Sequence, residues 1–463
     1  MAQEIEPESE VALFLASQIQ LENLEMKRRR MADALDPVTA IVYFKLRELY
    51  WTVTKQLGLG HLHNGSRSRD RLRLRRRPLL PRELASDDTL SSISSCRIFI
   101  DVTPTLRVGG KTGVQRVVRE IAKRAIQDGF ALPVVVENGE LLSYYDHPLL
   151  PASITFREGD KFMLLDASWG MLSEHLPLVQ RLADVGGQLI TVVHDLIPLI
   201  HPLSVTPRMT EEFKEWFENL VLKSDRIICV SKSTAMDLIA YVARRDLATK
   251  PHLRIGWWRL GADFDDEENF SISPEAKIVT TCETPYFLSV GTLEPRKCYP
   301  IALDAFERLW SRGIDARYVI IGRAGWQSEF LEHRIRQHGE FGRRLLWLDE
   351  ASDADLHHCY AHARALVYPS MIEGFGLPLV EAGRYGLPVI ASDLAVFHEI
   401  GGDHVRYFNL LDSTDLADKI EELHREPIKK EKMPVYSWDD SARSLANLIL
   451  NDAYQTRTEV VPA

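Results

Sequence analysis

The sequence has few cysteines, and their spacing indicates neither a disulfide framework nor a zinc site. Its five cysteines are scattered over 463 residues without a CxxC pair, as is typical of buried thiols in a reducing compartment. The acidic N-terminus lacks the basic and apolar regions of a signal peptide. No apolar run reaches the roughly 18 residues needed to span a bilayer. These absences predict a cytoplasmic protein, with peripheral contact at the inner face of the cytoplasmic membrane left open.

An overall excess of positive charge is also missing. The formal net charge is -10, which argues against nucleic acid as the main partner. One tract departs from this average, because a run of arginines is opposed only by Asp70; its members are Arg67, Arg69, Arg71, Arg73, Arg75, Arg76 and Arg77. The chain is too long for one hydrophobic core, so we expect two domains and additional segments.

Residues 1–90 differ in pattern from the rest of the chain. Asp36 and Pro37 form a helix start, and the helix predicted from there to Leu57 carries an unusual set of aromatic side chains: Tyr43, Phe44, Tyr50 and Trp51. This mainly helical extension and its arginine tract are compatible with binding to an anionic membrane surface. They are equally compatible with a helix that packs on the rest of the protein or on a partner, followed by a solvated basic linker.

From Cys96 onward, short apolar runs alternate with helical patterns. In the first half, Thr112–Gln127 is predicted as an amphipathic helix and Ser231 as a helix cap, and buried strands are predicted at Arg97–Val102, Phe162–Leu165, Leu189–Val193 and Arg226–Val230. After an acidic linker at Asp263–Glu268 the pattern restarts, with strands predicted at Tyr286–Val290, Tyr318–Ile321, Leu345–Leu348, Ala365–Tyr368 and Pro388–Ala391.

This alternation predicts an α/β protein with two doubly wound, Rossmann-like domains that face each other across a cleft. We expect the first domain at 96–265 and the second at 275–435. A C-terminal helix within 436–463 is expected to return to the first domain. Because ligands bind at the carboxyl ends of parallel strands, the cleft is the expected active site.

The segment Pro369–Glu381 has the composition of a ligand-binding turn between a strand and a helix. A predicted strand ends at Tyr368, and Pro378 stands where a first helical turn would begin. Gly374 and Gly376 allow a ligand to approach the backbone closely. The start of the helix would present free N–H groups and a positive dipole end to a diphosphate.

Two carboxylates accompany this turn. Glu373 precedes the helix and is placed to reach a sugar hydroxyl, while Glu381 lies about one turn inside it. A carboxylate that accepts both vicinal hydroxyls of a ribose is a common solution for nucleotide binding. The spacing alone is also compatible with two solvated glutamates on an ordinary turn.

A second motif, Gly291–Lys297, follows the strand predicted at Tyr286–Val290. It places Arg296 and Lys297 at a strand's carboxyl end, where cations would neutralise the charge of a leaving diphosphate. Without further support, an ordinary charged turn explains this motif equally well.

Together these residues carry a clear resemblance. The second half resembles the C-terminal domain of family-four retaining glycosyltransferases of the GT-B architecture, through Gly291–Lys297, Ile321–Trp326, the pair Glu373 and Glu381, and Gly386–Ser392. The first half resembles the N-terminal domain of bacterial members that build O-antigen and other surface polysaccharides, through Thr112–Arg116, Leu165–Trp169, His194–Pro198 and Val230–Ser231.

The resemblance implies a role for each matching residue. It implies that Arg296 and Lys297 hold the donor diphosphate, that Glu381 holds the ribose and that Glu373 contacts the donor sugar. With His194 at the reacting sugar, the implied catalytic set is His194, Arg296, Lys297 and Glu373. Further donor contacts are implied at Gly113, Thr292, Leu348, Gly374, Phe375, Gly376 and Leu377, and acceptor-side positions at Thr112, Gly113, Arg116 and Asp195.

Two of these assignments carry alternatives. A single histidine at a strand end, such as His194, is more often structural than functional. Many relatives have arginine where Thr292 stands, so that Arg296 would supply the only guanidinium of its motif.

The family's activity implies transfer of a hexose from a nucleoside diphosphate sugar with retention of anomeric configuration, without a metal or a cofactor. The leaving phosphate is expected to accept the acceptor's proton, so the residues act by position and charge. Likeness to O-antigen mannosyltransferases favours mannose from GDP-mannose and a lipid-linked or growing glycan as acceptor. Other UDP- or GDP-linked donors, such as glucose, rhamnose or fucose, remain alternatives.

Two other motifs are weaker. Asp263-Phe-Asp265 matches the D-x-D pattern of metal-dependent glycosyltransferases, but it lies in an acidic linker and is interpreted as a solvated charge run. Gly109–Thr112 resembles the end of a P-loop, although Thr105 occupies the position of its first glycine. A nucleotide hydrolase is therefore the alternative from another enzyme class.

Overall fold

The computed structural model describes Thr89 and residues 97–109, 112–145, 150–264, 272–282, 284–427 and 432–457. The chain divides into two units, Met1–Arg77 and Pro78–Ala463, and the description below concerns the second. The helix and arginine tract predicted within residues 1–77 lie outside the described residues. Within the described residues, no helix is long and apolar enough to cross a membrane.

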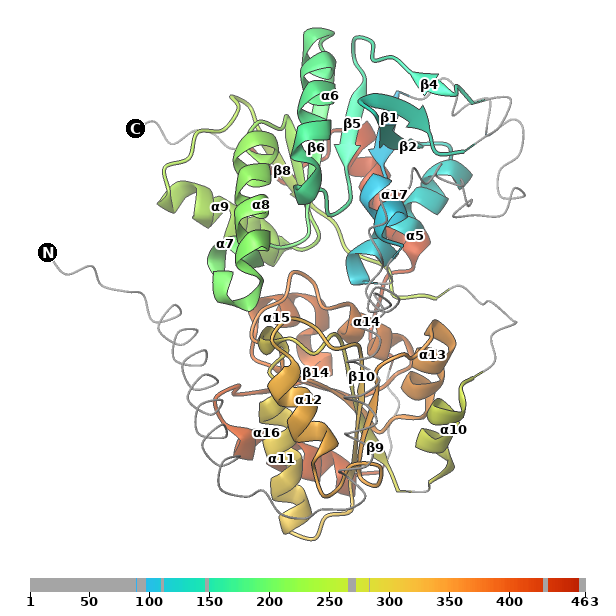
Figure 1. Ribbon diagram of the computed structural model, residues 1–463, viewed down its shortest axis with the longest axis vertical. Coiled ribbons are helices and arrows are strands. Elements are labelled where there is room, and N and C mark those ends of the chain that lie inside the picture. Colours follow the sequence, from blue (N-terminus) through green and yellow to red (C-terminus); the bar gives the residue numbers. More distant parts are fainter. Residues whose placement is uncertain are drawn as a thin grey trace, which may run out of the picture. The chain divides into compact units, whose positions relative to one another are not determined.

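The first half of the described chain, together with one strand from near its end, forms a nine-stranded sheet, here called the N-terminal sheet (Figure 1). Its spatial order is β15-β8-β7-β6-β5-β1-β2-β3-β4. The strands are β1 (Ile98–Asp101), β2 (Leu132–Glu137), β3 (Glu140–Ser143), β4 (Ser153–Ile154), β5 (Lys161–Leu164), β6 (Gln188–Val193), β7 (Arg226–Cys229), β8 (Arg254–Trp257) and β15 (Thr456–Arg457). The strands from β8 to β2 run parallel, while β3, β4 and β15 add antiparallel pairs at the two edges.

Helices follow most strands of this sheet, as the alternation of patterns predicted. They are α4 (Thr103–Val108), α5 (Gly113–Gln127), α6 (Leu172–Asp184), α7 (Ile197–Ile200), α8 (Pro207–Trp216) and α9 (Lys232–Arg244), with the short 3-10 helices η2 (Trp169–Met171) and η3 (Pro202–Ser204) and the π-helix η4 (Phe217–Val221). The predicted cap is confirmed, because the Ser231 side chain accepts a hydrogen bond from Thr234 N at the start of α9. β1 is buried along its whole length, as expected for a strand covered on both faces.

The second half forms a six-stranded parallel sheet, here called the C-terminal sheet, in the order β11-β10-β9-β12-β13-β14. Its strands are β9 (Tyr286–Val290), β10 (Arg317–Ile321), β11 (Leu345–Leu348), β12 (Ala365–Tyr368), β13 (Val389–Ser392) and β14 (Val405–Phe408). The helices are α10 (Pro274–Thr281), η5 (Pro295–Lys297), α11 (Tyr299–Ser311), α12 (Glu329–Arg336), α13 (Asp353–His362), α14 (Leu377–Arg384), α15 (Ala395–Gly401), η6 (Gly402–His404) and α16 (Ser413–Arg425). The predicted fold class, two Rossmann-like halves, is therefore confirmed.

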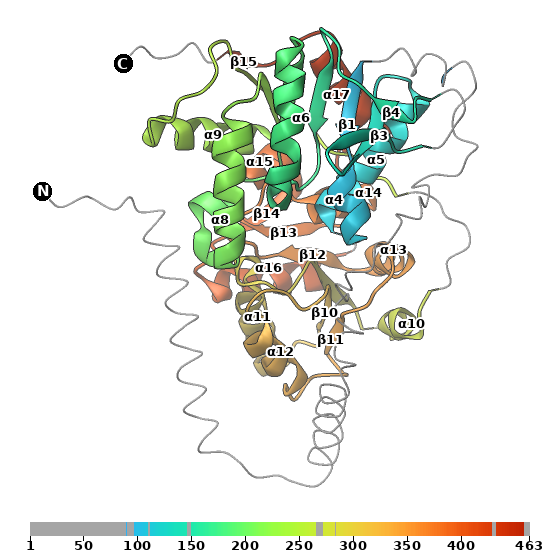
Figure 2. The ribbon, with the colours of Figure 1, turned by 45° about the horizontal axis from the view of Figure 1, so that its top comes forward.

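The last helix, α17 (Trp438–Leu450), returns to the N-terminal sheet and packs against α5 (Figures 1 and 2). The chain thus passes between the two sheets twice, and the two passages lie side by side. Gly261 and Tyr436 form a bridge, and Ala262 N donates to Tyr436 O at 2.9 Å.

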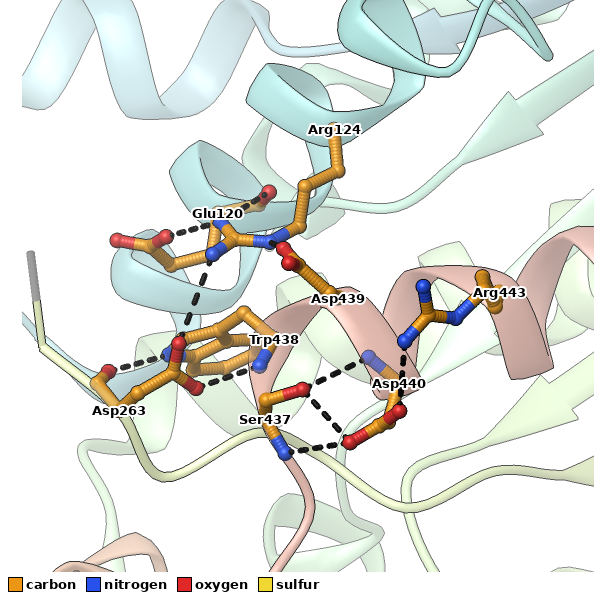
Figure 3. Close-up of polar contacts among 8 residues, drawn as sticks. All are labelled: Glu120, Arg124, Asp263, Ser437, Trp438, Asp439, Asp440 and Arg443. Carbon is orange, nitrogen blue, oxygen red and sulfur yellow. Dashed lines mark hydrogen bonds and ion pairs between the residues drawn. The ribbon is translucent and has the colours of Figure 1, made fainter.

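Figure 3 shows the polar contacts that fix these passages. Asp263 Oδ1 accepts from Trp438 N at 2.5 Å, and Asp263 O accepts from Trp438 Nε1 at 2.8 Å. The Arg124 guanidinium contacts Asp439 at 2.6 Å and Asp263 at 3.7 Å. The interpretation of Asp263 as a solvated charge is therefore wrong for this residue, since its carboxylate joins the two passages. Asp265 lies outside the described residues.

Candidate active site

The candidate site lies where the winding of the C-terminal sheet reverses. From β9 the chain proceeds through β10 to β11 on one side, and then returns to β12 on the other side of β9. The carboxyl ends of β9 and β12 therefore flank the topological switch point, where open α/β sheets bind ligands. The motif Gly291–Lys297 follows β9, and Pro369–Glu381 follows β12, so the fold brings the two predicted motifs together.

Glu373 lies between Arg296 and Lys297, the two cationic side chains that are predicted to hold the donor diphosphate. Lys297 Nζ donates to Glu373 Oε1 at 2.5 Å, and Arg296 Nη1 donates to Glu373 Oε2 at 3.2 Å. Ser370 Oγ donates to Oε1 at 2.7 Å, and Arg296 also donates from Nε to Glu294 at 2.9 Å. Two cations and two carboxylates thus form a closely paired cluster, in which Lys297 is buried and the other three side chains are partly exposed.

Charge sets the protonation of this cluster. Burial opposes ionisation of Glu373, but the charges of Lys297 and Arg296 outweigh it and lower the pKa of the carboxyl to about 2. Burial also opposes the charge of Arg296, yet Glu373 and Glu294 raise its pKa above the ordinary value. Glu373 is therefore an anion at neutral pH, and it is unsuited to act as a proton-donating acid.

Gly374 joins this cluster to the N-terminal sheet. Its carbonyl oxygen accepts from Ser231 Oγ at 2.7 Å and from Thr234 Oγ1 at 2.9 Å, at the start of α9. A Cβ atom at this position would lie 1.9 Å from His194 O. Backbone from the facing half therefore makes the close approach at Gly374, and the approach of a ligand to this backbone stays a prediction.

The remaining predicted turn residues start α14. Gly376 is the N-cap, with a φ of 100° that favours glycine. Leu377 opens the helix and lies opposite Gly113, where a Cβ would be 3.1 Å from Leu377 Cδ1. Phe375 is buried in the core. The start of α14 therefore faces the start of α5.

Glu381, predicted to hold the ribose, is buried and already has two partners. Its Oε2 accepts from Tyr360 OH at 2.8 Å, and its Oε1 accepts from Arg116 Nη1. Arg116 also lies 3.3 Å from Asp353. Arg116, which was predicted to lie near the acceptor substrate, thus contacts a carboxylate that was predicted to bind the donor substrate.

His194 and Asp195 follow β6 and approach the site from the N-terminal sheet. His194 Nε2 lies 2.8 Å from Leu165 O; because a carbonyl only accepts, Nε2 carries the proton. Burial lowers the pKa of His194. Burial also raises the pKa of Asp195, although the positive charge of Arg296 acts to lower it. Asp195 Oδ1 accepts from Ile197 N at 3.0 Å. At neutral pH His194 is therefore neutral, and its Nδ1 is left as an acceptor.

Three predicted residues lie at the margins of this arrangement. Thr112 precedes α5, and its N–H donates to Gln115 Oε1 at 3.0 Å. Thr292 packs near Gly325 of the loop after β10. Leu348 ends β11 at the edge of the sheet and is buried.

The structure adds partners that the sequence analysis missed: Glu294, Ser370, Asp353, Tyr360 and Phe264. Glu294 and Ser370 lie within three residues of the groups they contact, so spacing to a candidate site residue is a signal that would have found them. No signal in the sequence points to the other three, since tertiary packing alone brings them to Arg116 and Glu381.

The P-loop alternative meets a structural obstacle. A P-loop needs an open, glycine-bearing loop after its strand, but residues Thr103–Val108 form the helix α4 directly after β1. Gly109 ends this helix in a left-handed conformation with a φ of 61°. The described part of this segment is therefore not a phosphate-binding loop.

Comparison with known proteins identifies the second half. Residues 275–438 match the family described as "Glycosyl transferases group 1". This region is a group 1 glycosyltransferase domain. It contains the cluster of Arg296, Lys297 and Glu373 as well as Glu381, so the family resemblance drawn from those residues is confirmed.

The curated relatives extend the similarity into the first half. The chain is 33% identical to the serotype-specific mannosyltransferase WbdA of Escherichia coli over 344 residues, which cover 70% of this chain and 42% of WbdA. It is 31% identical to the O-antigen chain mannosyltransferase B of Escherichia coli over 226 residues, covering 46% of this chain and 55% of that protein. The chain thus spans less than half of WbdA.

A solved structure with the same fold is that of Anabaena HepE in complex with UDP and glucose. It matches with a TM-score of 0.51 and 16% identity, covering 76% of this chain and 95% of HepE. At this identity the likeness shows the fold alone, and it agrees with the two Rossmann-like sheets of a GT-B protein.

Proposed function

We propose that the group 1 glycosyltransferase domain makes this protein a hexosyltransferase that uses a nucleoside diphosphate sugar. The observation that carries the proposal is the position of Glu373 between Lys297 and Arg296, at the switch point of the C-terminal sheet. Two donors of positive charge there would stabilise a departing diphosphate. The start of α14 would add free N–H groups beside them.

In the proposed donor complex, each carboxylate has a separate task. Glu381 accepts the ribose hydroxyls, while Glu373 orients both cations and contacts the sugar. Because Glu373 is held as an anion, it would stabilise positive charge on the sugar as the glycosidic bond breaks. His194 would accept a sugar hydroxyl hydrogen bond at its unprotonated Nδ1.

We further propose a retaining, metal-independent reaction. The departing phosphate would accept the acceptor's proton on the face from which it leaves, so the new bond keeps the configuration of the old one. The positive charges of Arg296 and Lys297 would take the place that a metal occupies in other glycosyltransferases. Catalysis would then come from positioning and electrostatics.

For the donor we propose GDP-mannose, and for the acceptor a growing bacterial surface glycan such as O-antigen or exopolysaccharide. The support is the similarity to WbdA and to mannosyltransferase B, which are named as mannosyltransferases. UDP- or GDP-linked glucose, rhamnose and fucose are the alternative donors. Peripheral membrane contact through residues 1–90 stays a prediction, to be checked by liposome flotation with and without them.

The test is a transfer assay with the full chain, mannose-terminated oligosaccharides and a panel of GDP- and UDP-sugars. We expect release of GDP from GDP-mannose only with acceptor, and an NMR spectrum showing an α-mannosyl product. Transfer from no sugar nucleotide would contradict the proposal. ATP hydrolysis without a sugar donor, abolished by Lys111→Ala, would favour the hydrolase alternative instead.

A further inference from the structure

The carboxylate proposed to hold the ribose is covered by the protein itself. The Glu381 side chain is only 5% exposed. Its two oxygens are occupied by Arg116 and by Tyr360 OH, the latter at 2.8 Å. A ribose diol that takes both oxygens must therefore replace at least one of these partners.

Tyr360 is not free to leave. It belongs to α13 in the same half as Glu381, it is fully buried, and its ring stacks on Tyr385 with centroids 5.8 Å apart. Burial, reinforced by Glu381, keeps the pKa of Tyr360 well above its ordinary value, so the hydroxyl remains a donor.

Arg116 is placed differently. It projects from α5, which packs with the N-terminal sheet, and its side chain is 17% exposed. Movement of α5 relative to the C-terminal sheet would separate Arg116 from Glu381 while Tyr360 stayed in place. Of the two partners, Arg116 is thus the one that a ligand can displace.

In the same position the guanidinium already contacts a second carboxylate. Arg116 Nη2 lies 3.3 Å from Asp353 Oδ1, and the Asp353 side chain is 52% exposed. The Phe264 ring lies beneath the guanidinium, with its centroid 4.7 Å from Arg116 Cζ, which favours a cation at this place. The guanidinium therefore rests on an aromatic face between a buried carboxylate and an exposed one.

We propose that Arg116 is a positioning residue with two partners: it covers Glu381 when no donor is bound, and it pairs with Asp353 when ribose hydroxyls occupy Glu381. This inference rests on the proposed role of Glu381. Donor binding then exchanges the Arg116–Glu381 ion pair for a ribose contact, while the pair of Arg116 with Asp353 is kept. The interaction of the ribose with Glu381 is weakened by the cost of releasing Arg116.

The test isolates the ribose contact with full-length protein. Calorimetry would give the Kd of GDP and of 2′-deoxy-GDP. The ratio of the second Kd to the first reports how much the 2′-hydroxyl contributes to binding. We expect Arg116→Met to raise this ratio at least threefold, because the competitor is gone. We expect Asp353→Asn to lower it at least threefold, because the alternative partner is weakened. UDP and 2′-deoxy-UDP serve as a second pair.

Controls separate this inference from the proposed function. Arg334→Met removes an arginine of equal exposure, 17%, from a carboxylate pair, and should leave the ratio unchanged. Glu381→Gln should bring it close to one. A ratio above one that Arg116→Met fails to raise would overturn the two-partner role alone. A ratio of one in both the unaltered protein and Arg116→Met would remove the ribose role of Glu381 as well. Asp353→Asn alters a surface side chain, so its predicted decrease stands even if Arg116→Met fails to fold; no decrease would overturn the proposal.

Discussion

A Cβ atom on Gly374 would lie 1.9 Å from the carbonyl oxygen of His194. Gly374 follows Glu373 in the C-terminal half, and His194 directly follows β6 of the N-terminal sheet. The two halves therefore meet at backbone distance, directly beside the proposed catalytic cluster. Glycine is needed at this position for space and not for its backbone conformation, because its φ lies outside the left-handed region.

Gly374→Ala should impair turnover. The added methyl group would push the two halves apart, and we expect kcat/KM to fall at least ~30-fold, equivalent to ~2 kcal/mol. Steady-state kinetics would measure this. Gly339→Ala is the matched control, because nothing lies within 4 Å of a Cβ there. Normal activity of Gly374→Ala would show that this contact does not form during turnover.

Lys297→Ala and Glu381→Ala should each cost at least ~2 kcal/mol in kcat/KM, through loss of diphosphate and ribose binding respectively. The matched controls are Lys214→Ala and Glu329→Ala, both on exposed helix positions. If both site variants turned over like the unaltered protein, the donor site would have to lie elsewhere.

The ionisation of Glu373 predicts a pH-dependent stability difference. A fall of its pKa from 4.5 in the unfolded chain to about 2 corresponds to about 3 kcal/mol. Because the folded pKa is the lower one, this stabilisation is complete above about pH 5 and is lost as the pH falls toward 2. Urea unfolding of the unaltered protein and Glu373→Gln from pH 3 to pH 7 would measure it. A difference that does not shrink at low pH would contradict the prediction.

Glu399 should stabilise the contact between the halves. Its carboxylate accepts from the backbone N–H groups of Lys232 and Ser233 at 2.7 Å each, at the start of α9, and α15 packs on α9 (Figure 2). Glu399→Ala should lower the free energy of unfolding by about 1–2 kcal/mol, as for loss of a helix cap. Glu399→Gln keeps one acceptor oxygen and should lose less. Equal stability of all three proteins would exclude this capping role.

The sequence predicts much of the fold, because its buried strands are continuous apolar runs. The strand predicted at Ala365–Tyr368 matches β12 and that at Tyr286–Val290 matches β9. The strands β3 and β14 were missed, since partly exposed strands leave only a weak apolar pattern.

The candidate site could be predicted as far as local spacing reaches. The turn residues Glu373 and Gly374 and the cations Arg296 and Lys297 lie in two short motifs, whose strands become neighbours through the winding of the sheet. The contact of Arg116 with Glu381 joins residues separated by 265 positions. It depends on how the two halves pack, which no local pattern encodes.

The return of α17 and β15 to the N-terminal sheet has a consequence for synthesis on the ribosome. The N-terminal sheet begins with β1 near residue 98, but it receives β15, one of its two edge strands, only when residues 456–457 have emerged. The C-terminal sheet, by contrast, is built from one uninterrupted stretch and has all its strands once residue 408 has been made. The order of completion is thus the reverse of the order of translation: the half that starts first is finished last. Loss of residues beyond 437 would remove α17 and β15 from the N-terminal half, while all strands of the C-terminal sheet would remain.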